Sequence, residues 1–263
     1  MKQRENGFTL IELIAVLAIL AILASAVIPN VANEVTKAIA QAEDQSLASI
    51  HKALDESIID MHVIPGTAVG QWDTSIAVYL SIPASQISSN NTGGGRRLIM
   101  RASNDLGAPP YNQSALFAAT GLPQEAMASG ALPRAMPLQS RMVLISNIEG
   151  DAPTDILTND QFDAVWQQAG DFPVGFAMTN KLRIERISFV RFFHAVTVSC
   201  SSVVNAPQWS IDSAAPKTLN VEVFTVYLIT GTLVNLFING ASAGTIVVSG
   251  PLGLTFNGTS WNY

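Results

Sequence analysis

A single carboxylate, Glu12, lies inside an otherwise apolar run that extends from Phe8 to Ile28. The run is long enough to cross a bilayer, because a helix needs about 20 apolar residues to span the hydrocarbon core. An ionised side chain near the membrane centre costs roughly 2.5 to 3.5 kcal/mol even on lenient insertion scales. Glu12 therefore needs a partner that offsets this cost. The chemistry open to it is ion pairing with a positive group in a low-dielectric setting.

The residues around this acid form a recognisable motif. The sequence Gly7-Phe8-Thr9-Leu10-Ile11-Glu12 follows a short polar leader, residues 1–7, which contains two basic side chains. This stretch resembles the processing site of type IV pilins and of type II secretion pseudopilins. The resemblance implies that a dedicated prepilin peptidase cuts between Gly7 and Phe8 and methylates the new amine of Phe8. It also implies that Glu12 acts in assembly.

Cleavage at this position would create the positive charge that Glu12 needs. The freed amine of Phe8 has no leader in front of it, and Glu12 of an adjacent subunit can meet it. We expect this pairing to set register and recruitment, because part of its Coulombic gain only offsets desolvation. The partners implied are the prepilin peptidase, the same or homologous pilin subunits, an inner-membrane assembly platform and membrane lipid.

Two simpler interpretations of the N-terminus stay open. The triplet Ala24-Ser25-Ala26 is typical of the cleavage site of an ordinary secretory signal peptide, and a plain uncleaved anchor would have the same apolar length. Glu12 argues against both, because it makes the apolar segment less stable in the membrane and has no function in either a signal peptide or a plain anchor. Lys2 and Arg4 precede the span, so we expect a single-pass inner-membrane protein whose C-terminal domain is periplasmic before it joins a pilus or pseudopilus.

One long helix should carry the motif. We expect it over residues 8–62, with 8–28 transmembrane and the remainder amphipathic, and with a kink at Pro29, which also matches a proline of many pilins. Apolar residues that recur mostly every four positions define the buried stripe: Val31, Val35, Ile39, Ala42, Leu47, Ile50, Leu54, Ile58 and Met61. Charged residues, Glu43 among them, are assigned to the other faces. Pro65-Gly66 cannot continue the helix, so it should end near His62.

The remainder, residues 63–263, should form one globular domain. Residues 63–140 are loop-rich, with short helices near 72–81 and 112–119 and a glycine loop at 88–95 that its composition marks as flexible. Residues 141–263 are β-rich, and Asn239-Gly240 and Asn257-Gly258 indicate hairpins. The predicted fold class is α+β, pilin-like, with a long N-terminal helix packed on an antiparallel β-sheet.

A search for enzymatic chemistry finds no supporting motif. The three histidines, His51, His62 and His194, have no metal-binding spacing, and a structural role is favoured for each. Calcium is the one candidate cofactor, because oxygen ligands gather at Asp151, Asp155, Asn159, Asp160 and Asp163. Their spacing is not that of an EF-hand, so a solvated loop with a helix cap is favoured over a metal site.

Nucleic acid is not expected as a partner. The formal net charge is −6, and the arginines Arg96, Arg97 and Arg101 have no interleaved aromatic residues, so they are interpreted as solvated. The lone Cys200 is interpreted as a buried core residue, although many pilins carry a disulfide.

The main hypothesis is therefore a structural, non-enzymatic subunit of a type IV pilus or a type II secretion pseudopilus. The alternative is a membrane-anchored or fibre-tip β-domain that binds a glycan or a surface. That alternative would need an exposed aromatic patch on the sheet.

Overall fold

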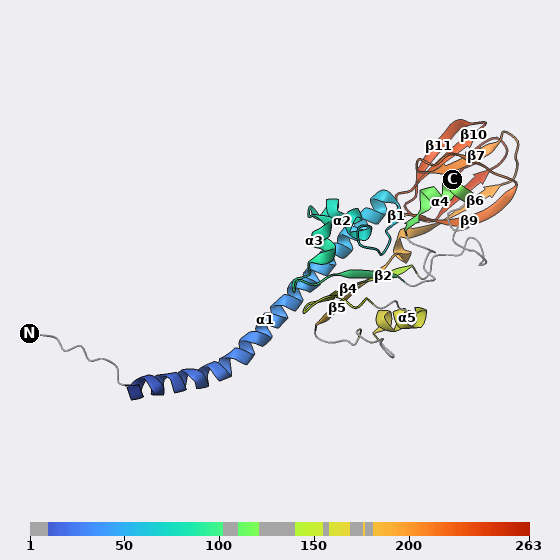
Figure 1. Ribbon diagram of the computed structural model, residues 1–263. Coiled ribbons are helices and arrows are strands. Elements are labelled where there is room, and N and C mark those ends of the chain that lie inside the picture. Colours follow the sequence, from blue (N-terminus) through green and yellow to red (C-terminus); the bar gives the residue numbers. More distant parts are fainter. Residues whose placement is uncertain (1–9, 102–109, 121–139, 155–157, 169–175, 177–180) are drawn as a thin grey trace, which may run out of the picture.

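The computed structural model describes residues 10–101, 110–120, 140–154, 158–168, 176 and 181–263 of the chain. In Figure 1, a long helix projects from a body that contains two β-rich parts. The first part is a three-stranded sheet that lies beside the helix, and the second is a pair of four-stranded sheets at the end furthest from the N-terminus. The α+β fold class predicted from the sequence is confirmed.

Helix α1 covers Leu10–Met61 and is 52 residues long, which corresponds to about 80 Å at 1.5 Å per residue. It ends where the sequence predicts, because His62 adopts a positive φ of 53° and the chain turns into strand β1 (Val63–Ile64). The buried stripe begins only near Ala40. Four residues predicted to belong to it are exposed: Val31, Val35, Ala42 and Met61.

A three-stranded antiparallel sheet, in the order β2-β4-β5, lies beside α1. It consists of β2 (Leu98–Arg101), β4 (Arg141–Asn147) and β5 (Leu182–Ser188). Alternate residues of β4 enter different cores: Met142 and Leu144 pack with α1, whereas Val143 and Ile145 pack with α5 (Asn159–Gln167). This period of two buries the sheet between helices on both faces.

Two short helices complete the packing around α1. Helix α2 (Trp72–Leu80) and helix α3 (Ala84–Ser89) cover its other side, as Figure 1 shows. Trp72 and Ile76 of α2 are fully buried in the same core as Leu47, Leu54 and Ile58 of α1. The sequence predicted α2 but missed α3 and β2.

The C-terminal strands form two sheets rather than the single sheet or meander expected. One has the order β11-β10-β7-β8 and the other β13-β12-β6-β9. Their bounds are β6 Phe193–Cys200, β7 Pro207–Ile211, β8 Lys217–Thr218, β9 Glu222–Ile229, β10 Leu233–Ile238, β11 Ala241–Val247, β12 Leu252–Phe256 and β13 Trp261–Asn262. Strand β12 pairs with β6 in parallel, whereas the other pairs are antiparallel. We call this part the β-sandwich.

The β-sandwich has its own apolar core. Inward residues of both sheets pack together, among them Val198, Trp209, Phe224 and Leu236. Helix α4 (Gln113–Thr120) follows β3 (Tyr111–Asn112), which pairs with β1, and it adds Phe117 to this core. The ring of Phe117 meets that of Trp209 edge-on at 4.9 Å between centroids.

Both predicted hairpin signals lie at strand reversals. Asn239 and Gly240, with φ of 52° and 77°, form the tight connection from β10 to β11 that two positive φ values allow. The second connection is looser, because Phe256 pairs with Trp261 and leaves four residues between β12 and β13. Only Gly258 has a positive φ there. Cys200 is buried, as predicted.

Candidate functional site

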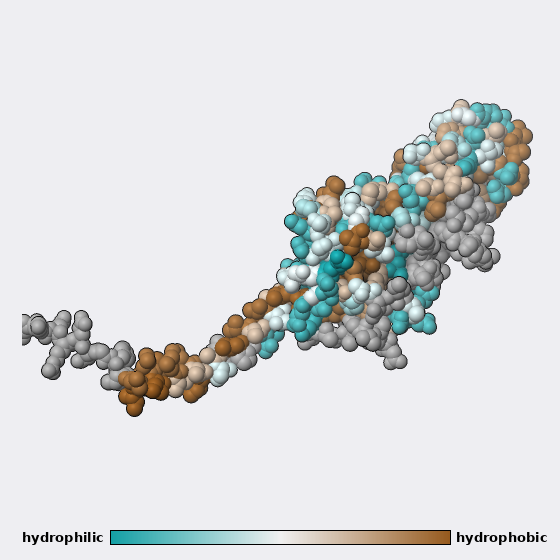
Figure 2. All heavy atoms as spheres, viewed as in Figure 1, coloured by the Kyte–Doolittle hydropathy of each residue, from teal (hydrophilic) through white to brown (hydrophobic). Residues whose placement is uncertain are grey.

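The N-terminal part of α1 exposes apolar side chains on all its faces. From Leu10 to Ile28 each large aliphatic side chain that the structure describes is at least 47% exposed. In Figure 2 brown side chains dominate the far end of the projecting helix, whereas the surface of the body is mixed. We call this projecting part of α1 the stalk. Among the described residues, α1 is the one helix long and apolar enough to span a membrane. A surface helix of a soluble protein carries its apolar side chains on one face and buries that face against the core, so exposure of apolar groups on all faces indicates an apolar environment for this segment.

Glu12 lies in the first turn of α1 and is exposed like its neighbours. Gly7 and Phe8, the predicted processing residues, lie outside the described residues. The proposed pairing between Glu12 and a neighbouring amine therefore stays a prediction.

Helix α1 continues through Pro29 without interruption of its helical assignment. Figure 1 shows that α1 is curved, with its dark blue end turned away from the line of the segment that meets the body. A ring nitrogen cannot donate the usual backbone hydrogen bond, which is a common cause of a helix bend. The assignment of the bend to Pro29 stays a prediction.

The most heavily bonded charged site is a buried ion pair that the sequence analysis missed. Glu43 of α1 is 0% exposed and Arg97, which precedes β2, is 4% exposed. The Nε and Nη2 atoms of Arg97 donate to the two carboxylate oxygens of Glu43, both at 2.8 Å. The prediction that Glu43 lies on a polar face and that Arg97 is solvated was wrong. A signal was present, because Glu43 falls midway between the apolar residues Ile39 and Leu47, at the helical spacing of four.

Further hydrogen bonds satisfy both partners of this pair, which we call the Glu43–Arg97 clamp. The backbone N–H and the hydroxyl of Thr92 donate to Glu43 at 3.0 and 2.8 Å. Arg97 also donates to the carbonyl of Ile87 and to the hydroxyl of Ser46, each at 3.0 Å. Burial alone would raise the pKa of Glu43, but the hydrogen bonds from Arg97 and its neighbours, with the charge of Arg97, outweigh burial and lower it to about 2.

The glycine loop that supplies Thr92 is a packed structure, contrary to the prediction of flexibility from its composition. The amide of Asn91 donates to the hydroxyl of Ser146 and to the carbonyl of Asn147, and its oxygen accepts from the N–H groups of Gly93 and Gly95. A Cβ on Gly95 would lie 1.7 Å from a backbone carbonyl oxygen. Gly93 and Gly95 are therefore needed for close backbone approach, whereas Gly94, with a φ of 84°, supplies the left-handed backbone conformation that favours glycine.

The three histidines have structural partners, as predicted. His51 is 2.6 Å from Glu185, His62 is 3.1 Å from Asp212, and His194 meets the hydroxyl of Thr230 at 3.0 Å. The His62–Asp212 contact joins the end of α1 to the β-sandwich. Burial would raise the pKa of Asp212, but hydrogen bonds from His62, Ser114 and Leu233 lower it.

The acidic residues considered for calcium are not gathered into one site where the structure describes them. Asp163 pairs with Arg141 at 2.6 Å, and Asp151 accepts from the backbone N–H of Arg96. Asp155 lies outside the described residues. Within the described ranges no group of three or more His, Cys, Asp or Glu side chains is placed to hold a metal ion.

The aromatic patch required by the glycan-binding alternative is not formed by the β-sandwich tryptophans. Trp209 and Trp261 are both buried in its core. Tyr263 is exposed, but a single ring does not make a platform. No observation therefore favours that alternative.

Comparison with known proteins gives one match. Residues 2–28 match the family model described as the prokaryotic N-terminal methylation motif. No curated protein and no solved structure matches the chain. The matched segment contains the predicted cut site and Glu12, and it overlaps the exposed apolar part of α1. Together they indicate membrane anchoring, and the chain carries the N-terminal signature of the prepilin-like proteins, the type IV pilins and pseudopilins.

Proposed function

We propose that this chain is a structural subunit of a type IV pilus or a type II secretion pseudopilus and has no enzymatic activity. The observation that carries the proposal is that the methylation motif and the exposed apolar part of α1 lie in the same segment of the chain. The methylation motif at residues 2–28 overlaps the part of α1 that leaves the body and exposes apolar side chains on all faces. Such a helix is stable in lipid before assembly, and among the apolar helices of other subunits after assembly.

In this proposal the prepilin peptidase removes residues 1–7 and methylates the amine of Phe8. The remaining subunit is held in the inner membrane by α1, with its body on the periplasmic side. An assembly platform then brings it to identical or homologous subunits. Glu12 recruits the next subunit, because its carboxylate is costly in lipid when unpaired and is neutralised by the amine of a neighbouring Phe8.

Mass spectrometry of the mature N-terminus tests the processing step. We expect a chain that begins at N-methylated Phe8 when the protein is produced with its own peptidase. A mature chain that begins at Val27 would identify an ordinary signal peptide and refute the proposal. Replacement Gly7→Ala should stop the cut, because a Cβ at the cut site intrudes on the peptidase.

Electron microscopy of filaments tests the assembly step. Glu12→Ala should leave the cut intact and abolish filaments. The matched control is Glu34→Ala, which removes an exposed acid from the same helix beyond the apolar segment. Filaments of Glu12→Ala at the wild-type abundance would refute the assembly role.

A further inference from the structure

We propose that the Glu43–Arg97 clamp is a positioning device that sets the direction in which the apolar stalk of α1 leaves the body. Its consequence for assembly rests on the function proposed above. Its consequence for the geometry of the single subunit is independent of that function.

The clamp lies at the point where α1 separates from the body. Ala40 is the first buried residue of the helix, and the described side chains on its N-terminal side, except half-buried Ile39, are exposed. The other end of the docked segment is tied at Asp60, which accepts from the hydroxyl of Tyr79 at 2.8 Å, and at His62. Between these ends the docked part of α1 has further ion pairs with the body, at Asp44 with Arg183, at His51 with Glu185 and at Asp55 with Arg191. The clamp is the fully buried pair, and it is the one nearest the stalk.

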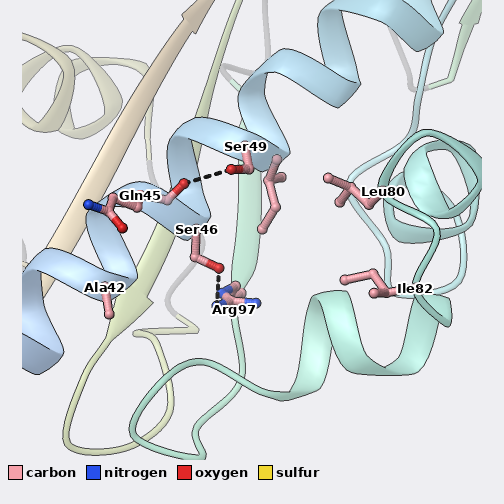
Figure 3. Close-up of a pocket in the computed structure, with 8 residues that line it drawn as sticks. Ala42, Gln45, Ser46, Ser49, Leu80, Ile82 and Arg97 are labelled. Carbon is pink, nitrogen blue, oxygen red and sulfur yellow. Dashed lines mark hydrogen bonds between the residues drawn. The ribbon is translucent and has the colours of Figure 1, made fainter.

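Apolar packing alone holds this end of the segment weakly. Figure 3 shows an open pocket beside Arg97, between α1 and the α2–α3 connection. Ala42, Ser46 and Ser49 of α1 form one wall, and Leu80 and Ile82 lie across from them without filling the space. Apolar contacts are also non-directional, so they would tolerate a small rotation or tilt of the helix.

The clamp does not tolerate such a movement. Two parallel N–H···O bonds from a planar guanidinium define both the distance and the angle between the partners. The guanidinium is itself held by the carbonyl of Ile87 and the hydroxyl of Ser46, as the dashed line in Figure 3 marks for Ser46. The packed glycine loop holds Thr92 against the same carboxylate. A tilt of α1 would break bonds to a charge that water cannot reach.

A fixed exit direction matters because the assembling group is far from the body. Glu12 and Glu43 are about 46 Å apart along an unbent helix, at 1.5 Å per residue. A small tilt at the clamp is multiplied along this length. Subunits that must align both their stalks and their bodies then require one stalk direction in each copy.

Distance measurement between two spin labels on the full-length protein in detergent tests the proposal. The labels replace Asn33 on the projecting part of α1 and Asp160 of α5 in the body, which are both exposed, in a background with Cys200→Ala. The test variant is the pair Glu43→Leu with Arg97→Met, which removes both charges and retains bulk. The matched control is Lys37→Met, which removes an exposed charge of the same helix.

We expect one narrow distance distribution in the wild type and in Lys37→Met, and a broadened or second population in the double variant. The melting temperature of the double variant should fall only modestly, because apolar replacement of a buried ion pair is often neutral, whereas the N–H and hydroxyl of Thr92 lose their acceptor. Arg97→Lys keeps the charge but loses the two-bond fork, so it should also broaden the distribution. A narrow wild-type distribution in the double variant, or in Arg97→Lys if the double variant does not fold, would overturn the proposal.

Filament counts separate this proposal from the function itself. The double variant should be processed normally and yield fewer filaments, whereas Glu12→Ala should keep the narrow distribution and yield none. Filaments of Glu12→Ala would refute the assembly role of Glu12 but would not affect the proposal that the clamp sets the direction of the stalk. Normal filaments together with a broadened distribution in the double variant would overturn the link between clamp and assembly.

Discussion

Protonation of Glu43 should be a main cause of acid unfolding, and Glu43→Gln isolates it. The hydrogen bonds and charge of Arg97, acting against burial, lower the pKa of this carboxyl from 4.5 to about 2. A group with a lowered pKa in the folded state stabilises the fold fully above its unfolded pKa. That stability is lost as the pH falls from about 4.5 to about 2. At 1.36 kcal/mol per pKa unit, the loss is about 3 kcal/mol.

Glu43→Gln replaces the carboxylate by a neutral group of the same shape, so it mimics the protonated form at any pH. At neutral pH it leaves the buried Arg97 without its counter-charge, which should cost about 3 kcal/mol. Because the variant has no titrating group at this site, the site should contribute almost nothing to the pH dependence of its free energy of unfolding between pH 4.5 and pH 2. The wild-type and variant curves should therefore converge at the acid end.

Denaturant unfolding of the full-length protein in detergent, followed by tryptophan fluorescence, measures both curves. Trp72 is fully buried in the core that contains α1, and the other three tryptophans lie in or against the two remaining cores, so the signal follows unfolding of the whole body. Glu34→Gln, on an exposed surface pair of the same helix, is the control and should follow the wild type within about 0.5 kcal/mol. Parallel curves for wild type and Glu43→Gln across this pH range would refute the reasoning.

Three other substitutions test the glycine loop, the β-sandwich core and the contact between α1 and the β-sandwich by the same unfolding assay. Gly95→Ala should lower the free energy of unfolding by about 2 kcal/mol or more, because its Cβ would lie 1.7 Å from the carbonyl oxygen of Gly150. The control Gly150→Ala has open space for its Cβ and should be nearly neutral. Equal effects of the two substitutions would contradict this reasoning. Phe117→Ala should cost about 3 to 5 kcal/mol by opening a cavity against Trp209, and a loss below 1 kcal/mol would show that α4 does not support the β-sandwich. Asp212→Asn should lower stability at neutral pH and reduce its loss on acidification, since the folded-state pKa of Asp212 is lowered; an unchanged pH slope would exclude this contribution.

The long helix could be predicted because its causes are local. An apolar run, a stripe of period near four and the terminating Pro65-Gly66 all lie within one continuous stretch. The motif at residues 7–12 is likewise local, and it supplied the functional hypothesis. The capping of α5 by Thr158, whose hydroxyl accepts from the backbone N–H of Gln161, is a signal of the same kind.

The clamp could not be predicted because its cause is not local. The spacing of the apolar stripe could have placed Glu43 on the buried face, but it does not name a partner, because Arg97 is 54 residues away in the sequence. Composition also misled the interpretation of the glycine loop. Glycine allows both flexibility and close backbone approach, and only the fold decides that Gly93 and Gly95 lie against the turn after β4.

The pairing of the C-terminal strands is beyond sequence reasoning for a related reason. Alternation identifies β9 and β10 but does not say which strand each will meet. Trp209 of β7 and Leu236 of β10 pair in one sheet, although a whole strand of the other sheet, β9, lies between them in sequence. The single sheet expected from consecutive hairpins became two for this reason.

The parallel pairing of β12 with β6 has a consequence for the order of folding during synthesis. Leu252–Phe256 fills the position beside Val196–Cys200, so the sheet that begins with β6 lacks a member until the last strands have emerged. Until then β6 offers an unsatisfied edge that can attract strands of other chains. A nascent chain in this state depends on chaperones or on rapid completion of the sheet to avoid aggregation.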